Sequence, residues 1–389
     1  MPATRCRIWG GLAAAALITA ACHSTTAPQP QLSNPQQLSS DLQTVAGVFT
    51  SPTFQSFSAL RNAAGSPVGP AAPAGALLGA APIVAPRTST QPYAGAMARL
   101  QALRLAASTL NPSISASVIP PSILGETFEW STTTHQYAAN PSASPAAPAN
   151  GIRLILYATD PITGAIVESP LTPVGYLDLL DLSTTNTNTV RVILAGGTPA
   201  SPGTTYVDYT ISGTVTRNSS NVATAFNASA VGYVSDGAGG HRLDFNASFA
   251  ATHLDTTPSA QIDVTWNLNT PAVSLALHET VAAVDANDAT ITIDFSITHG
   301  TETVRAAGTI TLASGTITAD VTIYLNGEAY AHITGSANAT TNSIQIRHED
   351  GTQLSTSELQ AVSQLFSAPD QIAAAIDDLF HPAEHLMGA

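Results

Sequence analysis

The most restrictive feature of this chain is a strict alternation of apolar and polar residues that recurs between residues 204 and 346. The clearest examples are residues 243–249, 262–268, 291–297 and 317–325. Successive side chains of a β-strand point to opposite faces of its sheet, so each stretch predicts a strand with one buried and one solvated face. Antiparallel sheets tolerate that asymmetry, whereas parallel sheets are usually covered on both faces.

Turn signals separate these stretches at short intervals along the chain. They are the dipeptides Asp236-Gly237, His299-Gly300, Ser314-Gly315, Asn326-Gly327 and Asp350-Gly351. The strongest is Asn326-Gly327, because a two-residue type I′ hairpin needs a positive φ at both positions. Ten or more strands of roughly 8–12 residues, joined by such hairpins, predict an antiparallel meander. We expect its first strands at residues 125–138 and 151–159.

Helical periodicity flanks the alternating region. Apolar residues recur at helical spacing between 42 and 60 and again over Ala94–Leu110. The sequence Ser355-Thr356-Ser357-Glu358 has the pattern of a capping box, in which the first hydroxyl and the last carboxylate satisfy backbone N–H groups at a helix start. A large sheet with one apolar face has to curve and be covered. The predicted fold class is therefore mainly β (α+β): a large curved antiparallel meander sheet or open barrel, with N- and C-terminal helices covering the apolar face.

Charge and cysteine content exclude several classes of function. The formal net charge is −14, and all twelve basic residues are Arg. An acidic chain with so few cations argues against nucleic acid as a partner. Lys is absent, which removes Schiff-base chemistry through an amine. No cofactor fingerprint is present, so no cofactor is expected.

Residues 1–22 have the pattern of an export signal. Arg5 and Arg7 precede an uncharged run from Ile8 to Ala21, and Cys22 follows directly. That run is too short to span a bilayer, which needs roughly 20 apolar residues. The segment Leu17–Cys22 resembles the lipobox of bacterial lipoproteins, although Thr19 stands where that family most often has Leu. The resemblance implies cleavage before Cys22, lipidation of its thiol, and attachment to a membrane through the lipid anchor.

The chain divides accordingly into five parts. They are a signal peptide at 1–21, a lipidated Cys with a disordered tether at 22–38, a helical and Pro/Ala-rich segment at 39–124, the antiparallel β domain at 125–354, and C-terminal helices at 355–389. A curved one-faced sheet with helical cover is also similar in architecture to the half-barrel lipoprotein carriers of the bacterial envelope. That resemblance implies a concave face that holds acyl chains, and it rests on architecture and location rather than on a motif.

The most specific chemical motif lies at the C-terminal end. His381-Pro382-Ala383-Glu384-His385 spells the H-x-x-E-H pattern of inverted zinc proteases. Only four residues follow His385, so no third ligand can come from further along the chain. Pro382 also opposes a rigid site within a helix. We therefore treat His381, Glu384 and His385 as weak metal candidates and expect no catalytic residue among them.

Other candidate residues are scattered. His278, His299, His332 and His348 are predicted at or near strand ends, where neighbouring imidazoles could bind a metal. The segment Asp285–Asp288 offers three oxygen side chains for Ca²⁺, but hairpin turns use the same residues. Asp178 and Asp181 could form an acid–base pair, although nothing in the sequence aims them at a substrate.

These features predict a lipid-anchored protein of the cell envelope. In the lipoprotein family, Asp directly after the cysteine commonly signals retention in the inner membrane. Because His23 follows Cys22 here, the resemblance implies the outer membrane in a cell with two membranes. Within that class we expect a non-enzymatic module that binds or carries an apolar ligand such as a lipid. One alternative is a structural scaffold, and another is a metal-dependent hydrolase that uses His and Asp clusters. An unfilled cavity behind the apolar face would favour the carrier, a packed face the scaffold, and converging carboxylates or imidazoles the hydrolase.

Overall fold

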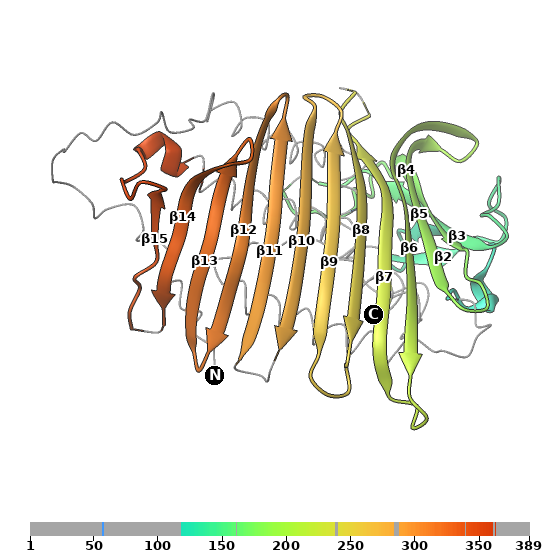
Figure 1. Ribbon diagram of the computed structural model, residues 1–389. Coiled ribbons are helices and arrows are strands. Elements are labelled where there is room, and N and C mark those ends of the chain that lie inside the picture. The colour runs from blue at the N-terminus through green and yellow to red at the C-terminus, as the bar shows by residue number, and fades with distance from the viewer. Residues whose placement is uncertain are drawn as a thin grey trace.

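One sheet dominates the fold (Figure 1). The computed structural model describes residue 57 and residues 118–160, 162–237, 240–283, 288–338, 340–360 and 362. In these residues a short 3-10 helix, η4 (Pro121–Ile123), precedes fifteen strands that form a single sheet. The strands are β1 (Thr127–Ser131), β2 (Gln136–Ala139), β3 (Gly151–Tyr157), β4 (Pro173–Asp181), β5 (Asn188–Thr198), β6 (Ser201–Arg217), β7 (Ala223–Ser235), β8 (Arg242–Thr252), β9 (Ser259–Leu268), β10 (Val273–Ala283), β11 (Ala289–His299), β12 (Glu302–Ala313), β13 (Thr316–Leu325), β14 (Glu328–Ala337) and β15 (Gln345–His348).

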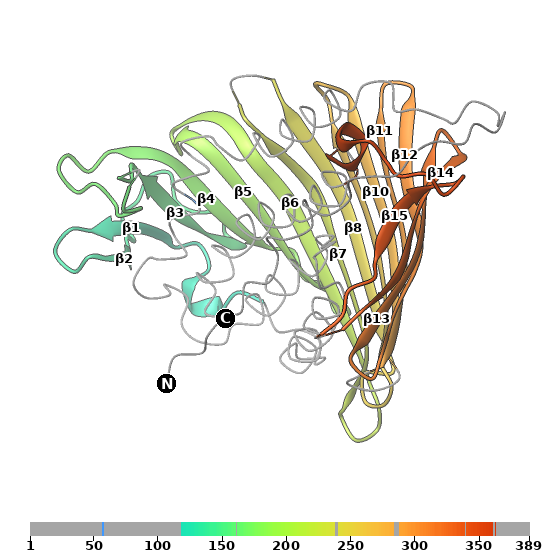
Figure 2. The same ribbon diagram turned by 90° about the vertical axis from the view of Figure 1, so that its left-hand side faces the viewer.

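The topology is the predicted meander over most of the sheet. From β3 to β15 each strand pairs antiparallel with the next one in the chain. The sheet also bends strongly, so that its two ends turn toward the same side (Figure 2). The prediction of a mainly β fold with a large curved sheet is confirmed.

The first strands differ from the prediction. The expected single strand over residues 125–138 is divided into β1 and β2 by a tight turn, in which the N–H of His135 donates to the carbonyl of Ser131 over 2.8 Å. His135 takes a positive φ of 53° there. β1 then pairs with β3 in parallel, through Thr127 opposite Arg153. The sheet is therefore mixed at this end, because the β1–β2 hairpin turns back before the chain reaches β3.

The predicted hairpin at Asn326-Gly327 is confirmed. These residues have φ values of 51° and 91°, which is the positive pair that a type I′ turn requires. Ser314 and Gly315 form a second pair with positive φ values, 50° and 79°. Each pair joins two long strands without a slip at the turn, since Leu325 lies opposite Glu328 and Ala313 lies opposite Thr316.

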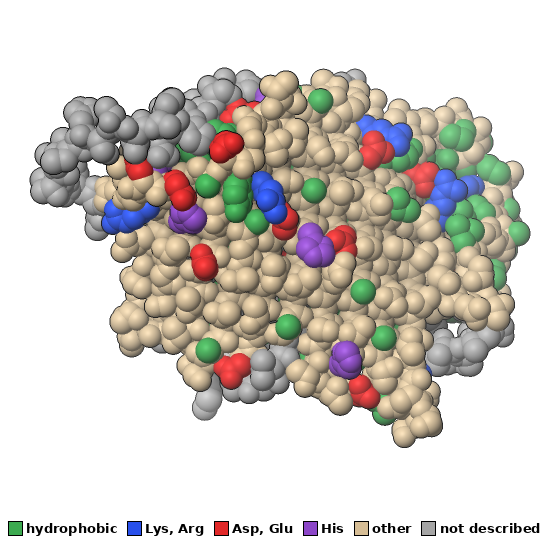
Figure 3. Space-filling model, in the orientation of Figure 1, with side chains coloured by type: hydrophobic (Ala, Val, Ile, Leu, Met, Phe, Trp, Pro, Cys, Tyr) green, Lys and Arg blue, Asp and Glu red, His purple; other side chains and the backbone are tan. Residues whose placement is uncertain are grey.

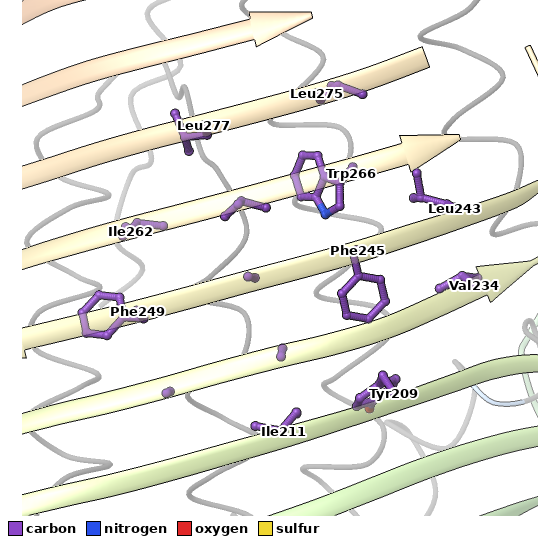
Figure 4. Packing of buried hydrophobic residues seen from close by; sticks show 14 of the residues in the cluster. Tyr209, Ile211, Val234, Leu243, Phe245, Phe249, Ile262, Trp266, Leu275 and Leu277 are labelled. Carbon is purple, nitrogen blue, oxygen red and sulfur yellow. The ribbon is translucent and has the colours of Figure 1, made fainter. Parts of the chain in front are cut away.

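Over most of the sheet the alternation separates an apolar face from a polar face, whereas every residue of β3 is buried. In β9 and β11, for example, every second residue is buried and the intervening ones are half-buried or exposed. The buried side chains project from one face, as Figure 4 shows for β6 to β10. Figure 3 shows the polar face in the orientation of Figure 1, and Figure 2 shows the bend of the sheet, whose convex side is that face. The apolar side chains therefore project from the concave side.

Several residues from outside the strands belong to the same buried cluster. Among them are Phe57 and Val362, which are 0% and 2% exposed and have helical backbones. The predicted capping box is also present, because the N–H of Ser355 donates to Glu358 over 2.7 Å and residues 356–360 are helical. The predicted helix at 94–110 and the rest of the terminal helices lie outside the described residues. Among the described residues, no helix is long and apolar enough to cross a membrane.

One acidic side chain lies on the apolar face. Glu279 of β10 follows Leu275 and Leu277 at the same spacing and is only 4% exposed. It stands opposite Ile262 on β9 and Ile293 on β11. Burying a carboxyl group is costly unless it interacts with another polar group. Glu279 is therefore a polar interruption of the apolar face.

Truncating a side chain at the centre of the apolar face is expected to destabilise the protein strongly. Phe295 of β11 is fully buried, so Phe295→Ala should lower the free energy of unfolding by ~3–5 kcal/mol. Val231 lies on the polar face with 52% of its surface exposed, and Val231→Ala should cost less than ~1 kcal/mol. Urea denaturation of both variants measures the difference, and equal costs would mean that the face containing Phe295 is not the core.

Candidate functional site

The structure does not describe the residues that form the most specific sequence motifs. Cys22, His381, Glu384 and His385 all lie outside the described residues. Lipidation of Cys22 and weak metal binding by the C-terminal histidines therefore stay predictions. Asp288 is described, and its carboxylate accepts a hydrogen bond from the backbone N–H of Ser314 over 2.8 Å. The other residues of the Asp285–Asp288 segment lie outside the described part.

Asp178 and Asp181 do not form an acid–base pair. They are three positions apart on β4, so their side chains leave opposite faces of the sheet. Asp178 instead accepts two hydrogen bonds from Arg153 on the neighbouring β3, over 2.7 and 2.8 Å, and both side chains are about nine-tenths buried. This bidentate ion pair is structural, since it satisfies two buried charges between β3 and β4.

The four candidate histidines occupy separate places, and two are not at strand ends. His278 and His332 lie within β10 and β14, because these strands extend several residues beyond each imidazole. His299 and His348 do end strands, as predicted. His332 pairs with Glu349, whereas His348 lies 3.5 Å from Glu358. No group of three His, Cys, Asp or Glu side chains that could hold a metal ion occurs in the described ranges.

His278 lies instead in a shallow groove on the polar face, which we call the polar groove. It crosses β8 to β12 and has a volume of about 460 Å³. Its ionisable side chains are Asp263, His278, Asp294 and Arg305. Its hydroxyl and amide side chains are Asn246, Ser248, Thr265 and Ser296, and it is completed by Val264, Ala276 and Leu277. Figure 3 shows the face on which it opens, where a few charged side chains are spread among uncharged polar ones.

The ladder register brings the ionisable residues of the groove together. Asp263 of β9 stands opposite His278 of β10, which in turn stands opposite Asp294 of β11. Side chains directly opposite each other on adjacent strands are close enough to interact. His278 Nδ1 is 2.6 Å from Asp263, so the ring N–H donates to that carboxylate. Arg305 of β12 donates to both oxygens of Asp294 through Nε and Nη2, each over 2.7 Å.

These contacts keep both carboxylates of the groove ionised. Partial burial by itself would raise the pKa of Asp263, but hydrogen bonds from His278 and Gln261 outweigh it and lower the pKa. The bidentate hydrogen bonds of Arg305, with its charge, lower the pKa of Asp294. A general acid at neutral pH needs a raised pKa, as in hydrolases that work with two carboxyl groups. Neither carboxylate of the groove has the raised pKa of such a general acid.

Comparison with known proteins adds no assignment: no family, no curated protein and no solved structure matches the chain. The class of protein is therefore defined only by the fold of the described residues, a curved mixed sheet of fifteen strands that has an apolar and a polar face over most of its width.

The polar groove could not be predicted from its residues taken one at a time. In the sequence, Asp263 and Asp294 are merely polar residues of alternating stretches, and Arg305 belongs to no recognisable motif. The usable signal was the turn spacing. Once His299-Gly300 is taken as a tight turn, counting outward from it brings Asp294 and Arg305 to neighbouring strands on the same face.

A second polar cluster couples β14 to the helix start at Ser355. The hydroxyl of Tyr330 donates to Glu358 over 2.7 Å, and the N–H and hydroxyl of Ser355 lie 2.7 and 2.6 Å from the same carboxylate. Partial burial would raise the pKa of Glu358, but the bonds from Ser355 and Tyr330 outweigh burial and lower the pKa from 4.5 to about 2. This cluster is structural, since it caps the helix and holds it on the sheet.

Protonation of Glu358 is expected to weaken the fold in acid. Its pKa is lower in the folded chain, so the stabilisation is complete above pH 4.5 and is lost as the pH falls toward about 2. Glu358→Gln should reduce that pH dependence and lower the free energy of unfolding at pH 7 by ~1–3 kcal/mol. Glu349→Gln is the matched control, because Glu349 forms an exposed pair with His332 that contributes little. Urea denaturation across this range of pH measures both, and an unchanged acid slope in Glu358→Gln would contradict the assignment.

Proposed function

We propose that this protein is a lipid-anchored, non-enzymatic protein of the cell envelope whose sheet serves as a rigid scaffold that exposes a polar binding face. The observation that carries the proposal is the packing of the apolar face. Trp266, Phe295 and Ile323 are exposed by 2%, 0% and 0%. Side chains buried to this extent leave no room beside them for an acyl chain.

This packing favours the scaffold over the carrier of an apolar ligand. A carrier needs space next to the apolar side chains of its sheet, because an acyl chain buries most of its surface in the pocket that holds it. The described apolar residues from β6 to β11 have almost no accessible surface, and Phe57 and Val362 pack in the same cluster. The carboxyl group of Glu279 in the middle of this face is a further disadvantage for an acyl chain.

The polar face supports a binding role without catalysis. The polar groove brings two carboxylates and one imidazole together, which is what the hydrolase alternative requires. Both carboxylates are held by partners that lower their pKa, so neither is suited to act as a general acid near pH 7. Their oxygens and the remaining N–H groups are nonetheless fixed in position, as hydrogen-bonding groups of a binding site should be.

The membrane anchor rests on the sequence around Cys22, and metabolic labelling tests it. In a bacterium with two membranes, the chain expressed with its own signal should incorporate labelled palmitate and sediment with outer-membrane fractions. Cys22→Ser should remove the label, because no other thiol remains after cleavage. Cys6→Ser is the matched control and should leave the label unchanged. Label that survives Cys22→Ser, or that is absent from the unsubstituted chain, would contradict the anchor.

Native mass spectrometry distinguishes the scaffold from the carrier. The chain lacking residues 1–22, purified without detergent, should show the mass of the polypeptide alone, because its apolar face is filled by its own side chains. The same sample after extraction with organic solvent and refolding provides the reference mass. A lipid adduct that disappears on extraction would favour the carrier and overturn the scaffold.

A further inference from the structure

The polar groove continues as a row of hydroxyl side chains across the sheet. On β8 its Ser248 stands opposite Ser229 of β7, which stands opposite Ser212 of β6, and the row ends at Thr189 of β5. The two last hydroxyls are 3.1 Å apart and share a hydrogen bond. In the other direction Ser248 stands opposite Asp263, the first ionisable residue of the groove. We call the row Thr189–Ser212–Ser229–Ser248 the hydroxyl row.

The groove and the hydroxyl row together form an elongated site. From β5 to β11 they cross seven strands in an unbroken series of directly opposed residues. Neighbouring strands are spaced about 4.8 Å apart, so the row is roughly 29 Å long. This length suits a linear polymer of several units that lies across the strands better than it suits a single small molecule.

The charges of the groove point to an uncharged ligand. The carboxylates of Asp263 and Asp294 are balanced by the guanidinium of Arg305 and, when it is protonated, by the imidazole of His278. A phosphate or nucleic acid would be repelled by the two carboxylates of the groove. The one permanent cation there, Arg305, is already paired with Asp294. A cationic ligand would have to displace Arg305 from a bidentate contact with Asp294.

The hydrogen-bonding groups favour a ligand rich in hydroxyls. The contact with Asp294 uses Nε and Nη2 of Arg305, which leaves Nη1 for a ligand. The contact of His278 with Asp263 uses Nδ1 and leaves Nε2. Arg305 is also stacked over the ring of Tyr324, 5.3 Å from its centre, which restricts the guanidinium. A hydroxyl group can both donate and accept, so it matches this mixture of fixed donors, carboxylate acceptors and serine hydroxyls.

From these observations we infer that the polar groove and the hydroxyl row bind a neutral, linear polysaccharide chain across β5 to β11 of the convex face. Sugar hydroxyls bind Arg305, His278 and the carboxylates in the groove, and further sugar units lie along the hydroxyl row. The chain is held without cleavage, because neither carboxylate of the groove is suited to protonate a glycosidic oxygen. This binding does not depend on lipidation at Cys22, so either inference can fail alone.

Isothermal titration tests the inference on the protein expressed with its own signal and purified from whichever fraction contains it, membrane or soluble. A polyoxyethylene detergent, which has no sugar headgroup, keeps the sample free of competing saccharide. The probes are cellohexaose, chitohexaose and maltohexaose, with inorganic phosphate as the anionic comparison. At least one hexasaccharide should bind with a dissociation constant at or below about 1 mM. Its affinity should not change between about 50 and 200 mM salt, because a neutral ligand releases no counterions.

The chain offers a closely matched pair of variants. Arg305→Gln should weaken hexasaccharide binding about tenfold or more, since it removes charged donors from the groove. Arg242→Gln is the control and should change it less than about twofold. Arg242 also pairs with an aspartate, Asp244, and is also stacked on a tyrosine, 3.7 Å from the Tyr233 ring centre, but it does not line the groove. Both pairs are exposed and contribute little to stability, so both variants should fold.

A third variant tests the hydroxyl row. Ser229 is exposed, so Ser229→Trp should obstruct the row without entering the core. It should weaken the hexasaccharide several-fold and leave the corresponding trisaccharide, which fits in the groove alone, unchanged. Three results would each overturn the inference: no hexasaccharide binds, phosphate competes for the site, or Arg305→Gln and Arg242→Gln have equal effects. An unchanged hexasaccharide affinity in Ser229→Trp would overturn the extension along the row.

Discussion

The structure depends on burying one face of a sheet that is too wide to remain flat. Fifteen strands accumulate twist from pair to pair, and burial of every second side chain makes the sheet bend around its apolar face. Each strand contributes only a few buried residues, yet Phe245, Trp266 and Leu275 lie in register across β8, β9 and β10 and pack as one layer. The bend and the core are therefore two results of the same alternation.

The alternation was also the part of the fold that the sequence could predict. Ile291 and Phe295 had to face the same way because the strand period is two, and the Asn326-Gly327 turn had to place Leu325 opposite Glu328. The register shift between Ile323 and Tyr324, just beyond that turn, has no such signal in the sequence. The parallel contact of β1 with β3 could not be predicted, because it depends on a short hairpin folding back and not on a residue pattern. The polar groove was missed for a related reason. His278 appeared to be an isolated imidazole, and only the register places it between Asp263 and Asp294.

On the polar face, charged side chains of neighbouring strands form ion pairs. Arg191 binds Asp208 and Arg305 binds Asp294, each across neighbouring strands over 2.7 Å. Such exposed pairs contribute little to the free energy of unfolding. They do fix donors and acceptors in position, and each balances one negative charge of the face. A face of this kind remains hydrated, avoids stacking on another sheet through apolar contacts, and can still recognise a partner by its hydrogen bonds.

An open sheet leaves two edges, and an exposed edge can pair with another chain. Here the two edge strands are the shortest, since β2 and β15 have four residues each whereas the central strands have ten or more. β15 also carries Arg347, whose guanidinium binds Gln345 and the carbonyl of Gly351 and so keeps a charge along that edge. β2 carries no charged side chain, so only its short length limits addition of a strand there, whereas β15 is both short and charged. The convex face presents the row from Thr189 to Asp294, whose side chains stand opposite one another from β5 to β11.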